Sequence, residues 1–265
     1  MRTNRSFGWL LLAVLTAAPV NGQDNSAEAL RITTEAAKDY DFQRKGEREQ
    51  RLKLHPRSVL HWSNPVAGEI YGNVFVWVDT KGRPAVIGSI LQWFAPMDHG
   101  SHEFHSLADV PVIGTRDGRA IWDCQSPGVD WQLAGFRPRN QASSASLLRQ
   151  ARTLAREFEV TKTDREQVTR RLRLMTQPIY QHHDADERFS GALFAFVQGT
   201  DPEAIVWIHN DAKEGWRYAF VRMNSVALVA RRQDTVVWSV QIEPWSKVKN
   251  GQEPYVHFGP FGGTR

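Results

Sequence analysis

Two segments of the chain resemble each other, and this internal similarity constrains the fold more than any single motif. Residues 72–90, GNVFVWVDTKGRPAVIGSI, align without a gap with residues 191–209, GALFAFVQGTDPEAIVWIH, at an offset of 119. The similarity extends upstream, where RLKL at residues 51–54 pairs with RLRL at residues 171–174. We interpret the pattern as a tandem repeat. The alternative is that two apolar hairpins share residue types without a common origin.

Each half of the chain predicts a helix followed by antiparallel strands. Apolar spacing favours helices over residues 26–40 and 142–158. Residues 74–78 and 193–197 are apolar on both faces, which is typical of central strands covered on two sides. Residues 79–83 have the composition of a turn between hairpin partners. We therefore expect the α+β class, with two tandem repeats that are each a helix packed on a curved antiparallel sheet, and the two-sided strands favour one shared core.

This interpretation divides the chain into four parts. They are a signal peptide at residues 1–22, a first α+β repeat at 23–135, a second α+β repeat at 142–242, and a Pro- and Gly-rich C-terminal tail at 243–265 that wraps the surface or frays.

The N-terminus has the pattern of a secretory signal peptide. Two arginines precede an apolar run at residues 8–18, and small residues follow up to Gly22. The run of 11 residues is shorter than the roughly 20 that cross a bilayer as a helix. We expect cleavage after Gly22, or alternatively at Ala17 and Ala18, and a periplasmic or extracellular protein without a membrane span in its mature form. An uncleaved N-terminal anchor is the other interpretation.

The charge and cysteine content exclude some functions. The chain has 33 basic and 29 acidic residues and a net charge of +4, which is small and evenly spread, so we expect no nucleic-acid partner. Cys124 has no second cysteine with which to form a disulfide. It follows Trp122 in an apolar segment, which predicts a buried, unreactive thiol.

Four segments resemble an uncharacterised family of exported bacterial proteins. They are HWSNP at residues 61–65, the strand pair at 72–90, HEFHSL at 102–107, and GALFAFVQGTDPE at 191–203. The resemblance covers most of the mature chain. It implies export, but it brings no established activity, ligand or catalytic residue.

The densest group of potential ligand side chains is Asp98, His99, His102, Glu103 and His105. Imidazole and carboxylate groups bind zinc and other divalent ions, but this spacing matches no known metal signature. If residues 103–108 form a strand, Glu103 and His105 share one face while His102 points to the other. We favour a solvated or hydrogen-bonded histidine cluster, and we predict no metal, no other cofactor and no catalytic residue.

The internal alignment places Glu103 opposite Arg222 and His105 opposite Asn224. Arginine is not a metal ligand, so the second half of the chain lacks the metal-binding chemistry. If the two halves pack about a pseudo-twofold axis, we expect these four residues to lie near one another as one composite polar binding site. The simpler alternative is a structural ion pair between Glu103 and Arg222.

The ten tryptophans are a possible surface for stacking on sugar rings. Trp77 aligns with another aromatic residue and is predicted to pack in the core. Trp62, Trp131 and Trp245 are flanked by turn-forming residues and are predicted to be exposed. Trp62 is therefore included among the candidate binding residues.

Together these features predict an exported, non-enzymatic binding or envelope-associated protein of unknown ligand, either a carbohydrate or another envelope component. The main reason is that the duplicated apolar scaffold carries no duplicated catalytic group. The alternative is a metal-assisted hydrolase centred on the cluster at residues 99–105.

Overall fold

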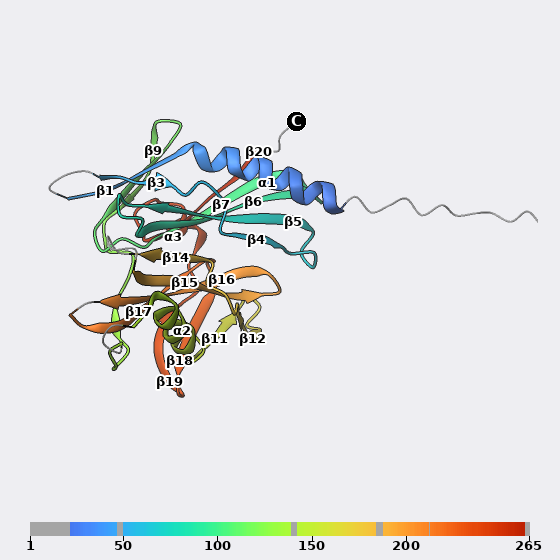
Figure 1. Ribbon diagram of the computed structural model, residues 1–265. Coiled ribbons are helices and arrows are strands. Elements are labelled where there is room, and N and C mark those ends of the chain that lie inside the picture. Colours follow the sequence, from blue (N-terminus) through green and yellow to red (C-terminus); the bar gives the residue numbers. More distant parts are fainter. Residues whose placement is uncertain (1–21, 47–49, 139–141, 184–187, 212, 263–265) are drawn as a thin grey trace, which may run out of the picture.

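Four antiparallel β-sheets, stacked in layers, make up most of the structure (Figure 1). This computed structural model describes residues 22–46, 50–138, 142–183, 188–211 and 213–262 of the chain. The predicted signal peptide, apart from Gly22, lies outside the described residues. Within these ranges, none of the helices has the length and apolar character needed to cross a membrane.

The two middle layers are the larger sheets, which we call the first and second inner sheets. The first inner sheet has the order β20 (Tyr255–Gly262), β7 (His99–Ser106), β6 (Pro84–Ala95), β5 (Glu69–Val78) and β3 (Lys53–Leu54), and β4 (Leu60–Ser63) also pairs with β5. The second has the order β10 (Gln132–Leu133), β17 (Gly215–Arg222), β16 (Asp201–Asp211), β15 (Phe189–Gln198) and β13 (Arg173–Leu174), and β14 (Tyr180–His183) also pairs with β15.

A smaller sheet covers the outer face of each inner sheet. The first outer sheet has the order β2 (Gln50–Arg51), β1 (Tyr40–Arg44), β8 (Val112–Arg116) and β9 (Arg119–Cys124). The second has the order β12 (Thr169–Arg171), β11 (Phe158–Thr163), β18 (Ala227–Arg232) and β19 (Thr235–Val240). The helices are α1 (Gly22–Lys38), which packs on β5 and β6, α2 (Ser144–Ala155), which packs on β15 and β16, and the short α3 (Trp245–Val248).

The central strands of the inner sheets are buried on both faces, as the sequence predicted. In β5, Phe75 and Trp77 pack toward the first outer sheet. Val74 and Val76 point the other way, into a core shared by the two inner sheets. β15 alternates in the same manner between the second outer sheet and this shared core. The prediction that Cys124 is a buried thiol is also confirmed.

The predicted fold class is wrong. The described chain forms twenty strands and three helices of 17, 12 and 4 residues, so the structure is mainly β, with four layered sheets rather than a helix on a curved sheet in each of two tandem repeats. A helix with its side chains is about 10 Å wide, whereas five strands spaced about 4.8 Å apart span about 20 Å. One helix therefore cannot cover an inner sheet, and the short outer strands cover the remainder.

The C-terminal segment and the last residues of the predicted first repeat both take part in the sheets. Residues 243–265 were expected to wrap the surface or fray, but β20 pairs with β7 along the edge of the first inner sheet. β10, in the part assigned to the first half, pairs with β17 of the second inner sheet. One strand of each inner sheet thus comes from outside the predicted repeat that supplies the other strands of that sheet.

Candidate functional site

The histidine cluster of β7 does not converge on one point. His102 faces the first outer sheet, where its Nδ1 lies 2.6 Å from the Tyr40 hydroxyl and burial lowers its pKa to about 3. His99 stacks on the ring of Trp93 at 5.2 Å. Glu103 shares the opposite face with His105, as strand alternation predicted. Among the described residues, no three or more potential ligands are arranged to hold a metal ion.

The four residues of the expected composite site lie in one region, within a larger interior polar cluster. This cluster comprises Glu103, His105, Asp201, Glu203, Arg222, Asn224, Tyr255 and His257. His105, Arg222 and Tyr255 line a cavity of about 140 Å³ within it. The cavity is closed on its other side by the C-terminal segment around α3.

The expected ion pair between Glu103 and Arg222 is replaced by other contacts. The Arg222 guanidinium lies 3.4 Å from the Glu243 carboxylate. It also donates hydrogen bonds to the backbone oxygens of Asn224 (2.7 Å) and Val226 (2.6 Å). These bonds use most of the five donors of a guanidinium, so Arg222 holds the loop after β17 and is not available to Glu103.

Glu103 is instead paired with His257, at 3.3 Å. Burial and the neighbouring carboxyl groups of Asp201 and Glu203 raise the pKa of Glu103 to about 8. Burial lowers the pKa of His257 to about 4. Near pH 7 the proton therefore resides on Glu103, and the pair is a neutral hydrogen bond rather than an ion pair. The interior polar cluster has the character of a structural network between two sheets.

Trp62 is not an exposed platform, so that prediction is wrong. Its side chain is 7% exposed, and its Nε1 donates a hydrogen bond to Ser89 Oγ at 3.0 Å. The ring lies directly over Gly72, where a Cβ atom would come within 2.0 Å of it. Trp131 is half-buried and Trp245 is 47% exposed, so exposure is confirmed for Trp245 alone.

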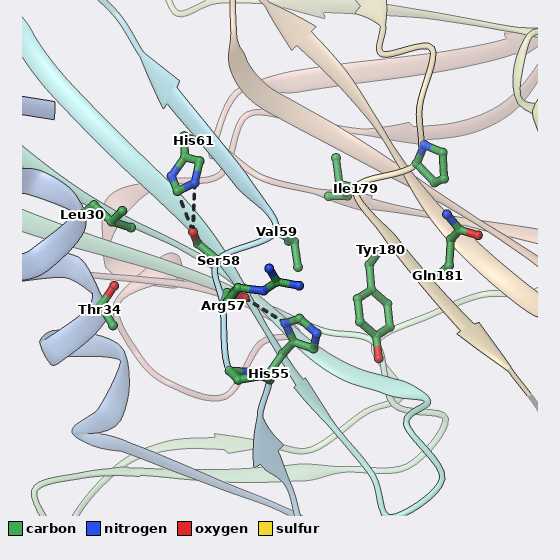
Figure 2. Close-up of a pocket in the computed structure, with 12 residues that line it drawn as sticks. Leu30, Thr34, His55, Arg57, Ser58, Val59, His61, Ile179, Tyr180 and Gln181 are labelled. Atoms are coloured by element: carbon green, nitrogen blue, oxygen red, sulfur yellow. Dashed lines mark hydrogen bonds between the residues drawn. The ribbon is translucent and has the colours of Figure 1, made fainter. Parts of the chain in front are cut away.

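A groove of about 630 Å³ lies away from the interior polar cluster (Figure 2). It lies between α1, the segment that joins β3 to β4, and the segment that leads into β14. We call it the α1 groove. Its lining residues are Leu30, Thr34, His55, Pro56, Arg57, Ser58, Val59, His61, Pro178, Ile179, Tyr180 and Gln181.

A chain of hydrogen bonds fixes the orientation of His61 in this groove. Thr33 Oγ1 donates to the backbone oxygen of Ala29 at 2.8 Å, so it accepts the bond from Asn73 Nδ2, also at 2.8 Å. The Oδ1 of Asn73 therefore faces His61 Nδ1 and accepts its hydrogen. His61 Nε2 is left with a lone pair, and the Ser58 hydroxyl lies 3.4 Å from it.

The α1 groove carries positive charge without a matching carboxylate. No Asp or Glu is among the described residues that line it. The guanidinium of Arg57 makes no hydrogen bond or ion pair with any described residue, and its side chain lies between Val59 and the His55 ring (Figure 2). His55 is held by its Nδ1, which donates to the backbone oxygen of Arg57 at 2.8 Å, and by a perpendicular contact with the Tyr180 ring at 5.5 Å.

The sequence analysis did not identify this groove. The His61–Asn73 contact joins neighbouring strands, and the groove is closed by a segment more than a hundred residues away. The available signal was the polar turn HPRS at residues 55–58, which enters a strand and has no acidic residue nearby to balance Arg57.

Comparisons of the chain with protein-family models, curated proteins and solved structures find no match. The resemblance to a family of exported bacterial proteins therefore stays a prediction.

Proposed function

We propose that this is an exported, envelope-associated binding protein that holds a small organic anion in the α1 groove. The observation that carries the proposal is that the Arg57 guanidinium makes no hydrogen bond or ion pair with any described residue, in a groove that no described Asp or Glu lines. Arginine recognises carboxylate and phosphate groups through paired, charge-assisted hydrogen bonds. A volume of about 630 Å³ lies within the range of roughly 300–1,000 Å³ typical of small-molecule sites.

The arrangement of the β7 side chains supports binding over the metal-assisted alternative. His102 and Glu103 point to opposite faces of the first inner sheet, and His99 is engaged with Trp93. The donor set that a hydrolytic metal centre needs is therefore divided among three environments. Export follows from the predicted signal peptide, which supports a ligand present in the cell envelope or outside the cell.

The proposal predicts that anion binding depends on Arg57. We expect Arg57→Gln to weaken the binding of organic anions by about tenfold or more, because a charge-assisted pair is lost while the groove keeps its shape. Isothermal titration of the purified protein with a panel of carboxylates and phosphate esters measures the effect. Arg51→Gln is the matched control, because Arg51 is exposed on β2 and pairs with Asp41 outside the groove. Equal anion affinities in the parent and the Arg57 variant would contradict the proposal.

A further inference from the structure

Two polar side chains of the α1 groove, Arg57 and His61, differ in what they can recognise. Arg57 offers positive charge and hydrogen-bond donors only. His61 offers a hydrogen-bond acceptor at its Nε2, because the bond to Asn73 keeps the proton on Nδ1. A ligand that satisfies both Arg57 and His61 must carry an anionic group and a separate hydrogen-bond donor.

The rest of the groove lining suits a hydroxylated carbon skeleton. Ser58 lies beside His61 and can both donate and accept hydrogen bonds. Leu30, Val59 and Ile179 add apolar contacts, and the Tyr180 ring stands at the far side (Figure 2). The Tyr180 hydroxyl donates to the backbone oxygen of Gly82 at 2.8 Å, which fixes the ring. Apolar C–H faces next to hydroxyl groups are the surface that a sugar ring presents.

We infer that the α1 groove binds a saccharide that carries an anionic group, either the carboxylate of a uronic acid or a phosphate ester. This inference rests on the proposed function and specifies the ligand of the same site. The anionic group pairs with Arg57, and a sugar hydroxyl donates to His61 Nε2 in place of Ser58. A simple dicarboxylate fits less well, because its second anionic group would face the lone pair of Nε2.

Isothermal titration with four probes tests the inference. The probes are digalacturonate, glucose 6-phosphate, the neutral disaccharide lactose, and succinate. We expect digalacturonate or glucose 6-phosphate to bind about tenfold or more tightly than lactose and succinate, since only these two satisfy both Arg57 and His61. The tighter of the two identifies the source of the negative charge.

Two variants separate the contributions of Arg57 and His61 to the affinity. Arg57→Gln is expected to reduce the affinity for the anionic sugar to that for lactose. His61→Phe keeps a ring but removes Nε2, and it is expected to reduce the affinity for the anionic sugar to that for succinate. Arg51→Gln is the control for the loss of an exposed arginine outside the groove. Nitrogen chemical shifts of the His61 ring report directly whether Nδ1 carries the proton.

The outcomes separate this inference from the function on which it rests. If succinate binds as tightly as the anionic sugars and still depends on Arg57, the saccharide inference fails and anion binding stands. If lactose binds as tightly as digalacturonate and Arg57→Gln has no effect, both fail. A proton on His61 Nε2 in the free protein would overturn the inference, because the lone pair would then face Asn73.

Discussion

Gly128→Ala is expected to lower the free energy of unfolding by about 3 kcal/mol, the upper part of the range for overpacked sites. A Cβ atom at this position would lie 1.9 Å from the backbone oxygen of Ser106 and 2.3 Å from its carbonyl carbon. Ser106 ends β7 and is fully buried. The clash is therefore with backbone in the middle of the structure, not with the end of a flexible side chain.

Neither partner in this contact can move easily. The amide of Gly128 donates to the backbone oxygen of Ala108 at 2.8 Å, which holds the segment against the end of β7. The amide of Ser106 in turn donates to the backbone oxygen of Pro254, just before β20, at 2.9 Å. Relieving the clash would break one of these buried hydrogen bonds, and an unpaired buried backbone group costs about 1–3 kcal/mol.

The matched control for Gly128→Ala is Gly46→Ala. No atom lies within 4 Å of the Cβ position at Gly46. The substitution therefore acts only by reducing the conformational freedom of the unfolded chain. That restriction is expected to leave stability unchanged or raise it by less than about 1 kcal/mol. Urea unfolding followed by tryptophan fluorescence measures both variants. Equal unfolding midpoints would show that the backbone around Gly128 is not closely packed.

The sequence predicted the inner strands better than the layers that cover them. Residues 74–78 and 193–197 are apolar without interruption, and this local pattern correctly placed them in two-sided central strands. The outer sheets depend on pairings that no local pattern reveals. β1, for example, has only five residues, and its Tyr40 pairs with Arg116. Burial of these short strands is decided by partners far along the chain.

The candidate site was predictable only where strand alternation decides it. The shared face of Glu103 and His105 follows from their spacing of two. Their environment does not, because Glu243 and His257 reach the cluster from the C-terminal segment that was expected to lie on the surface. The hydrogen-bond chain of the α1 groove likewise joins α1, β5 and β4. Such contacts follow from the tertiary fold and leave no spacing in the sequence.

The stability of the protein is expected to be greatest near pH 6.5 and to fall steeply on the acid side. Burial lowers the pKa of five histidines from 6.5 to about 3 or 4. They are His102, His105, His182, His209 and His257. Each binds a proton more readily in the unfolded chain. Their contribution is therefore complete above pH 6.5 and is lost as the pH falls toward 3–4.

Glu103 and Asp201 change the stability with pH in the direction opposite to that of the histidines. Burial raises the pKa of Glu103 from 4.5 to about 8 and also raises that of Asp201, next to Glu203. Each keeps its proton in the folded state over a range in which the unfolded chain releases it. Their contribution is complete below about pH 4.5 and is lost as the pH rises through about 8.

The two groups together set the shape of the pH profile. Between about pH 5 and 6, unfolding takes up one proton at each of five histidines and releases one at each of two carboxyl groups. The net uptake of roughly three protons corresponds to about 4 kcal/mol per pH unit. A domain with about 10 kcal/mol of stability would then unfold within two to three units below pH 6.5. Above pH 6.5 the release from the two carboxyl groups exceeds the remaining uptake by the histidines of the unfolded chain, so stability declines by about 1 kcal/mol per unit up to pH 8.

Urea unfolding at a series of pH values measures this profile. Glu103→Gln tests whether Glu103 contributes to the loss of stability above pH 6.5. Glutamine keeps the hydrogen-bonding shape of the protonated carboxyl and has no proton to release, so the variant is expected to gain stability relative to the parent at pH 8 and to match it near pH 4.5. Glu166→Gln, at an exposed position, controls for the loss of a carboxylate. A Glu103→Gln profile that runs parallel to the parent from pH 5 to 8 would mean that Glu103 is charged in the folded protein. The contact with His257, on the neighbouring strand of the same sheet, would then join a carboxylate to an imidazole, and the neutral hydrogen bond described above would be wrong.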